Sequence, residues 1–276
     1  MIEVPSKLTP RARQIYNALP ESLKWMARKL RNAISYVPLT RANARRRFLR
    51  NVYMSHIRDE HRYIFASIAR FCTTNRPIDG YYFEFGCHTA GTMRMAYDYF
   101  RYLFDWTYVA FDSFEGLPEI SDIDRQEIWQ RGKLATGEDE FVRRVIQNGM
   151  PREKLITVKG FYDKSLSNEL KQRLLPVKAA VVYIDCDLYA STVPVLEFVK
   201  DFFQVGTVLV FDDWNCFCGD PNRGERRAFR EFCERYPEFH FEDFISTHMQ
   251  KAFIYTGSVP SVAVRTTNAA TPGGSR

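Results

Sequence analysis

The sequence predicts an α/β protein, a three-layer αβα sandwich in which helices cover both faces of a mostly parallel, seven-stranded sheet. Three observations support this prediction. From Tyr81 onward, short apolar segments alternate with amphipathic helical segments, which is typical of a parallel sheet buried on both faces. The last two strand-like segments have no helix between them, which predicts an antiparallel hairpin at the C-terminal edge of the sheet. Basic amphipathic segments precede the first strand and predict a helical N-terminal extension.

The N-terminal extension is strongly basic. Residues 1–50 carry 12 Lys or Arg and 2 Asp or Glu, whereas the rest of the chain is mildly acidic. Residues 21–37 place apolar side chains on one helical face, and a second helix is expected from about residue 41 to 71. We interpret the extension as a cap that docks on the body or on a second copy of the chain, and we expect a homo-oligomer. Contact with a membrane surface is the less favoured alternative, and the acidic body argues against a nucleic-acid partner.

The strand candidates are short segments rich in β-branched and aromatic residues. Strands are expected at residues 81–86, 107–112, 155–159, 180–185, 207–212, 239–244 and 251–256. Helices are expected near residues 91–104, 138–148, 164–174, 192–203 and 224–236. The sequence therefore divides into a basic helical extension (residues 1–75), an α/β domain (residues 76–258) and a small, polar tail that is expected to be disordered (residues 259–276).

The composition is that of a globular protein. A chain of 276 residues, 45% apolar and 26% charged, is long enough to bury a large core. No segment approaches the roughly 20 uninterrupted apolar residues that span a bilayer, and the first ten residues lack the apolar centre of a signal peptide. The 6 cysteines form no CxxC pair and no regular framework. We therefore expect a cytoplasmic protein, with a peripheral location at the inner membrane surface if the extension binds lipid.

Carboxylates gather at the ends of two successive strand candidates. Asp185 and Asp187 follow the fourth strand, and Asp212 and Asp213 follow the fifth. One helix and a returning parallel strand fit between the two pairs, so they are expected to be neighbours at the edge where open α/β sheets bind ligands.

This concentration of negative charge predicts a metal site. Like charges this close repel one another unless a cation compensates them. Oxygen ligands alone favour a hard cation, Mg²⁺ or else Ca²⁺ or Mn²⁺. Capping of the following helices is the simpler interpretation, and it would account for one such Asp more readily than for four.

The turn after the first strand predicts a nucleoside-binding site. Gly86 and Gly91 let the backbone turn tightly and approach a ligand closely. The turn matches neither the GxGxxG motif nor a phosphate-binding loop, because Thr92 stands where the lysine would be. Asp112 ends the second strand, where a carboxylate can accept hydrogen bonds from a ribose diol. This combination fits a nucleoside-containing cofactor without a pyrophosphate, which favours S-adenosylmethionine over NAD.

Five motifs together resemble a known family. FEFGCHTAG, FDSFEGLPE, KGFYDKSL, YIDCDLYAST and VFDDW occur in the order found in the macrocin, mycinamicin and novobiocin type sugar O-methyltransferases, over about residues 80–256. The resemblance implies a Rossmann-like class I methyltransferase fold. It also implies an enzyme of natural-product or glycan biosynthesis that uses S-adenosylmethionine and Mg²⁺ to methylate a hydroxyl of a sugar or a glycosylated small molecule. Ala90 stands where the family usually has a second glycine, so the contacts of this turn are expected to differ in detail.

The resemblance also implies roles for individual residues. Asp187 would be the general base that takes the proton from the acceptor hydroxyl. The residues implied as metal ligands are Asp185, Asp212 and Asp213. The residues implied for the cofactor site are Glu84, Gly86, Gly91, Asp112, Ser113, Phe161 and Asp163, of which the last two would lie near the adenine.

Other polar and aromatic residues each have a functional and a simpler interpretation. His88 and His248 are candidate alternative bases, although a lone histidine is more often structural. The CFC segment at residues 216–218 favours loop packing over soft-metal chemistry, because no second Cys/His cluster accompanies it. Trp214 is equally suited to stacking on the acceptor and to plugging the strand end. The basic run at residues 223–227 favours a solvated helix face over contact with an anionic acceptor.

Two further functions remain open at this point. One is a nicotinamide-dependent α/β enzyme, against which the missing GxGxxG counts. The other is a non-catalytic scaffold that docks on a membrane or a partner through its basic extension, against which the intact carboxylate set counts. Residues 114–137 form a long connection of the kind that often serves as a lid.

Overall fold

The computed structural model describes residues 20, 22–26, 29–30 and 41–258. The chain divides into two compact units, residues 1–61 and 62–276. The expected tail at residues 259–276 and most of the expected helix at residues 21–37 lie outside the described residues. Within those ranges, the structure contains no helix that is both long and apolar enough to cross a membrane.

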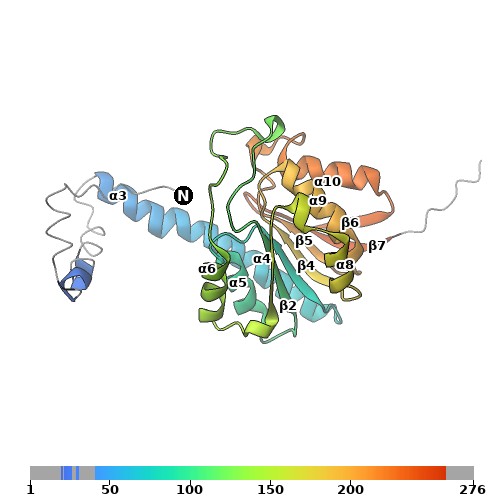
Figure 1. Ribbon diagram of the computed structural model, residues 1–276, viewed down its shortest axis with the longest axis horizontal. Coiled ribbons are helices and arrows are strands. Elements are labelled where there is room, and N and C mark those ends of the chain that lie inside the picture. The colour runs from blue at the N-terminus through green and yellow to red at the C-terminus, as the bar shows by residue number, and fades with distance from the viewer. Residues whose placement is uncertain (1–19, 21, 27–28, 31–40, 259–276) are drawn as a thin grey trace, which may run out of the picture. The chain divides into compact units, whose positions relative to one another are not determined.

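The second unit is built on a seven-stranded sheet with the strand order β3-β2-β1-β4-β5-β7-β6 (Figure 1). The strands are β1 (Tyr81–Phe85), β2 (Thr107–Asp112), β3 (Leu155–Lys159), β4 (Ala179–Ile184), β5 (Val208–Phe211), β6 (Phe239–Ser246) and β7 (Lys251–Ser258). The first five are parallel, and β7 runs antiparallel to both β5 and β6. This confirms the predicted α/β class, the mostly parallel sheet and the antiparallel edge hairpin.

Within residues 41–258, the α-helices are α3 (Arg41–Phe48), α4 (Met54–Thr74), α5 (Gly91–Phe100), α6 (Glu138–Gln147), α7 (Tyr162–Ser165), α8 (Asn168–Leu174), α9 (Tyr189–Val199) and α10 (Gly224–Arg235). Those from α5 onward lie between strands, as predicted. A π-helical turn at Leu49–Tyr53 joins α3 to α4. The buried side chains of α4 all lie between Ile64 and Cys72, so that end of the helix belongs to the core of the second unit.

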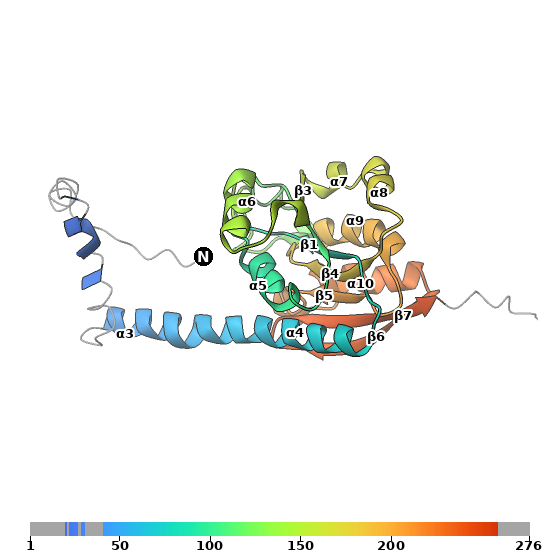
Figure 2. The ribbon, with the colours of Figure 1, turned by 90° about the horizontal axis from the view of Figure 1, so that it is seen from below.

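Two apolar layers pack against opposite faces of the sheet. One contains buried side chains of α4, α5 and α6, together with sheet residues such as Tyr82 and Tyr183. The other contains buried side chains of α8, α9 and α10, together with Phe83 and Phe85. Figures 1 and 2 show α5 and α6 on one side of the strands and α8, α9 and α10 on the other. Neighbouring β1 residues face opposite layers because side chains alternate along a strand, and this gives the three-layer sandwich.

The order of the strands determines where a ligand can bind. The chain moves from β1 outward to β2 and β3, then crosses back to β4 on the other side of β1. The connections on the two sides of β1 therefore diverge and leave a crevice at the carboxyl ends of β1 and β4.

Candidate active site

The pairing register aligns the ends of four neighbouring parallel strands. The paired residues, from one strand to the next, are Phe111, Phe85, Ile184 and Phe211. The residues that directly follow them are Asp112, Gly86, Asp185 and Asp212. Residues predicted for the cofactor and metal sites from distant segments thus meet at one edge of the sheet.

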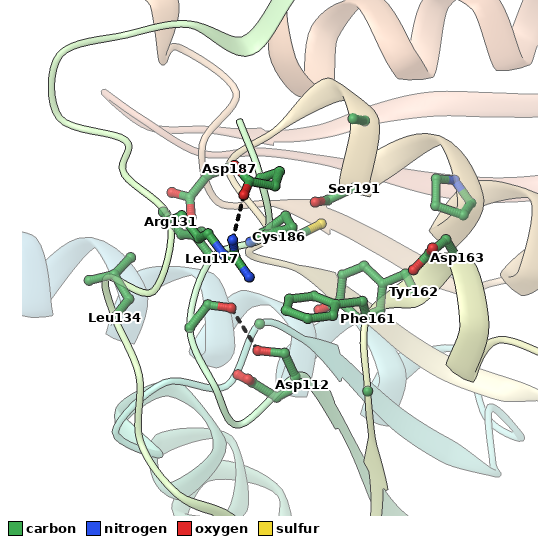
Figure 3. Close-up of a pocket in the computed structure, with 18 of the residues that line it drawn as sticks. Asp112, Leu117, Arg131, Leu134, Phe161, Tyr162, Asp163, Cys186, Asp187 and Ser191 are labelled. Atoms are coloured by element: carbon green, nitrogen blue, oxygen red, sulfur yellow. Dashed lines mark hydrogen bonds and ion pairs between the residues drawn. The ribbon is translucent and has the colours of Figure 1, made fainter. Parts of the chain in front are cut away.

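A cavity of about 500 Å³ lies at this edge, a size typical of small-molecule sites. The predicted site residues that line it are Gly86, Asp112, Ser113, Phe161, Asp163, Asp185 and Asp187. Figure 3 shows Asp112 and Asp187 toward opposite ends of the cavity, with Phe161 and Tyr162 along one side and Leu117 and Leu134 along the other. The remaining predicted residues, Glu84, Gly91, Asp212 and Asp213, are not among its lining residues.

Asp112 is held by the backbone of the turns around it. Its carboxylate accepts hydrogen bonds from the backbone N–H groups of Cys87 at 2.7 Å, His88 at 3.1 Å and Phe114 at 2.7 Å. A carboxylate offers about four acceptor positions, so capacity remains for a ligand hydroxyl. This geometry fixes the turn after β1 against the end of β2.

The turn after β1 adopts the conformation that glycine favours. Gly86 has φ of 85°, and a Cβ there would lie 1.7 Å from the carbonyl oxygen of Asp185. Ala90, which stands where the family usually has glycine, also takes the left-handed conformation, with φ of 63°. The alanine therefore preserves the shape of the turn at a conformational cost of about 1 kcal/mol.

Glu84 lies in β1, two residues before Gly86, and is fully buried. Its Oε2 accepts a hydrogen bond from the Tyr82 hydroxyl at 2.7 Å, and its Oε1 has no hydrogen-bond partner in the described part of the chain. Burial raises the pKa of Glu84 to about 8, although the Tyr82 hydrogen bond opposes that rise. The unpaired oxygen is an acceptor available to a cationic ligand group.

Three of the four predicted aspartates form a tight cluster. Ligand oxygens of Asp185, Asp187 and Asp213 all lie within 4.8 Å of one another. Burial, followed by the charges of neighbouring carboxylates, raises the pKa values of all three. The Oδ2 atom of Asp213 is buried and meets no hydrogen-bond donor among residues 41–258. Such a cluster of repelling carboxylates with an unpaired oxygen fits a divalent cation.

Asp212 is oriented differently from the cluster. Its Oδ1 accepts hydrogen bonds from the Tyr183 hydroxyl and, at 3.3 Å, from Nε2 of Gln250. The structure thus groups Asp187 with Asp185 and Asp213, whereas the resemblance implies Asp212 as the third ligand. The individual roles of these residues remain predictions.

Glu225 is a site residue that the sequence did not reveal. It is 1% exposed, and its Oε2 accepts a hydrogen bond from the backbone N–H of Asp213 at 3.0 Å. Burial raises the pKa of Glu225 well above its usual value, and the charge of Asp213 adds to the rise. The only sequence signal is an acidic residue in the first turn of α10, and the surrounding basic run obscures it.

The arginines of the basic run make contacts of two kinds. Arg223 donates to the backbone oxygens of Ile123 and Arg125, and its guanidinium lies 4.4 Å from the ring centre of Phe217. Arg226 donates to the backbone oxygen of Gly219. Arg223 and Arg226 therefore hold loops together, while Arg227 pairs with Glu231 at 2.7 Å on a half-exposed face of α10, as expected of a helix face at the surface.

The remaining candidates are also placed by the structure. His88 lines the cavity, and burial lowers its pKa. Trp214 packs against the rings of Phe211, Phe229 and Phe253, so it plugs the end of β5. The Cys216 thiol donates to Oδ1 of Asp213 at 3.1 Å, which agrees with loop packing.

Comparison with known proteins gives a family match and several structural relatives. The family model for macrocin-O-methyltransferase (TylF) matches residues 69–235. The O-methyltransferase NovP is 20% identical, with a TM-score of 0.55, over 71% of this chain and 79% of its own. The calicheamicin methyltransferase CalS11 is 18% identical, with a TM-score of 0.56, over 90% of this chain and 94% of its own. No curated protein matches the sequence significantly. The structural matches confirm a Rossmann-like methyltransferase fold.

Proposed function

The chain belongs to the macrocin O-methyltransferase family and is an S-adenosylmethionine-dependent O-methyltransferase, and we propose that it methylates a hydroxyl of a sugar or a glycosylated small molecule with the help of a divalent cation. A second structure of CalS11, its apo form, is described as that of a TDP-rhamnose 3'-O-methyltransferase and matches this chain with 16% identity and a TM-score of 0.50. The observation that carries the proposal is the cluster of Asp185, Asp187 and Asp213 beside a cavity that ends at Asp112.

The cofactor end of the cavity is formed by the turns after β1, β2 and β3. Asp112 retains acceptor capacity for a ribose hydroxyl, and Phe161 presents an apolar ring beside the cavity. Glu84 holds an unpaired oxygen below the turn, where it can interact with the ammonium group of a methionine moiety. S-adenosylmethionine, when bound, supplies an electrophilic methyl group. The protein contributes position and exclusion of water at this end.

The acceptor end is formed by the carboxylates after β4 and β5. Mg²⁺ is the cation we propose for Asp185 and Asp213, with Asp212 completing the set that the family resemblance implies. A cation held there lowers the pKa of a coordinated hydroxyl. Asp187 lines the cavity beside this cluster and is placed to accept the proton of the acceptor hydroxyl. Burial and the charge of Asp213 raise the pKa of Asp187 in the metal-free protein. A cation bound beside it would lower that pKa again and leave Asp187 ionised, as a proton acceptor must be.

Calorimetric titration with S-adenosylhomocysteine, first with Mg²⁺ and then with EDTA, tests the proposal. We expect micromolar or tighter binding in both buffers, because the cofactor end is built from elements other than the carboxylate cluster. Methyl transfer to a panel of nucleotide sugars and glycosides should then require the cation. Absence of cofactor binding in both buffers would contradict the proposed cofactor site, and methyl transfer that survives EDTA would contradict the metal dependence.

The two other functions considered from the sequence lose support. Membership of a methyltransferase family disfavours a nicotinamide-dependent enzyme and a non-catalytic scaffold. The cytoplasmic location, the homo-oligomer and the membrane contact of the basic extension remain predictions.

A further inference from the structure

Asp124 is a buried carboxylate in the long connection between β2 and α6. It is 0% exposed and ends a short 3-10 turn at Asp122–Asp124. Its side chain accepts hydrogen bonds from the backbone N–H groups of Tyr189 at 2.7 Å and Ala190 at 3.1 Å, and from the Ser121 hydroxyl at 3.1 Å. A residue of the connection therefore caps the start of α9, which is remote in sequence.

This cap acts where the helix cannot cap itself. Leu188 occupies the N-cap position of α9 and has no side chain able to accept from the first turn. Because the first amides of a helix have no intrahelical partners, Asp124 satisfies two of them. A charged acceptor at this position also interacts favourably with the helix dipole.

The capped turn carries the predicted general base. Asp187 lies two residues before α9 and has φ of 59°, a conformation that is unfavourable for a residue with a Cβ. The backbone N–H of Leu188 donates to the oxygen of Cys186 at 2.6 Å and closes a tight turn around Asp187. Such strain persists only where the surroundings restrain the backbone, and Asp124 supplies a restraint on the adjacent helical turn.

The connection is held at two separate places. Near its two ends, the backbone N–H of Leu117 donates to the oxygen of Lys133 at 2.9 Å, and the backbone N–H of Gly132 donates to the oxygen of Leu117 at 3.0 Å. In its middle, Asp124 binds α9, and Arg223 donates to the carbonyls of Ile123 and Arg125. Loss of the Asp124 contact should therefore loosen the middle of the connection, where Arg223 remains bound, and leave the contacts of Leu117 in place.

We propose that Asp124 is a positioning residue that couples the β2–α6 connection to the Asp187 turn. Asp187 is then aligned as the general base only while the connection is bound to α9. The proposal rests on the proposed function only in assigning Asp187 to the reaction. The restraint itself is a property of the chain without cofactor or metal.

Hydrogen exchange of the full chain without metal tests the coupling in the variant Asp124→Ala. Loss of two hydrogen bonds to a buried charged acceptor should speed exchange about tenfold or more in residues 185–191 and 119–127. Exchange in residues 81–92 should stay as in the wild type. The affinity for S-adenosylhomocysteine should change by less than about threefold, and the affinity for Mn²⁺, used as a probe of the carboxylate cluster, should fall about tenfold.

Two variants provide controls. Asp122→Ala removes a carboxylate from the same turn that is 90% exposed and pairs with Arg125, so it should leave exchange and Mn²⁺ affinity unchanged. Asp124→Asn keeps one acceptor oxygen, for one of the two amides, and should restore part of the protection. Wild-type exchange in residues 185–191 of folded Asp124→Ala would overturn the proposal, and so would an equal rise of exchange across the whole second unit. Failure of the wild type to bind S-adenosylhomocysteine would contradict the proposed function without affecting this result.

Discussion

Asp213 interacts with two neighbouring side chains of the site and keeps one buried carboxylate oxygen. Glu225 accepts from its backbone N–H, the Cys216 thiol donates to its Oδ1, and its Oδ2 finds no donor in the described structure. A buried acceptor without a partner costs about 1–3 kcal/mol. In the metal-free protein a protonated Asp187 can donate to the Asp213 carboxylate and offset part of this cost, and a bound cation would offset it by its charge.

Asp213→Asn should separate metal binding from stability. We expect Mg²⁺ affinity to fall more than about tenfold, because a ligand charge is lost, while the metal-free variant gains stability because a buried charge is removed. Titration with Mg²⁺ and thermal unfolding in EDTA measure the two effects. The resemblance implies Asp212 as a further ligand, so the Mg²⁺ affinity of Asp212→Ala should fall as well. Unchanged Mg²⁺ affinity in both variants would place the cation elsewhere.

Glu84 makes stability depend on pH. Its pKa of about 8 in the folded protein lies above the value of 4.5 expected in the unfolded chain. Between these values the folded state binds more protons, so this group lowers stability as pH rises, by at most about 1.4 kcal/mol per pH unit. Glu84→Gln should therefore gain stability relative to wild type as pH rises from 6 to 8. Urea denaturation at the two pH values, without cofactor, measures the difference; an equal effect at both would contradict the raised pKa.

At the scale of elements, the junction between β1 and β4 sets the geometry of the site. The backbone N–H of Asp185 donates to the oxygen of Phe85 at 2.8 Å, and that of Gly86 donates to the oxygen of Phe111 at 2.9 Å. Three strands are thus joined at the point where the chain leaves the sheet. Close approach of their backbones leaves no room for a side chain at Gly86.

Gly86→Ala should disrupt this junction. The added Cβ would meet the carbonyl of Asp185 at 1.7 Å, so β1 and β4 must separate, and we expect a loss of at least about 2 kcal/mol of stability. Gly91→Ala is the matched control, because no atom lies within 4 Å of its Cβ position and alanine favours the helix that begins there. Denaturant unfolding compares the two variants. Equal stability in both would contradict the crowding at Gly86.

At the scale of the whole molecule, strands were predicted better than helix starts. Apolar segments that end in Gly or Asp mark strands locally, and all seven lie close to their expected positions. The helix expected near residues 192–203 instead begins at Tyr189, because its cap comes from Asp124. The helix expected at residues 164–174 is two helices, since Ser167 caps the second by accepting from Leu170. Contacts between distant residues, such as those of Glu225, leave no pattern in a single sequence.

The basic extension should control assembly. Phe48, Val52 and Tyr53 are each about half exposed, and α3 buries none of its side chains. Because a group of exposed apolar side chains marks an interaction surface, we expect the full chain to form an oligomer and a variant lacking residues 1–53, which removes all three, to be a monomer. Light scattering coupled to size-exclusion chromatography measures both. A monomeric full chain would contradict the prediction, and sedimentation with anionic liposomes would then test the membrane alternative.

Different segments of the chain line different parts of the cavity. The turns after β1, β2 and β3 line the end that we propose for the cofactor, while Leu117, Arg131 and Leu134 of the β2–α6 connection line the cavity on the side opposite Phe161. Directed evolution can therefore diversify these positions without touching the cofactor end. If the proposed ends are right, substitutions at these three positions should change substrate scope and leave methyl-donor use intact, provided that Asp124 is kept.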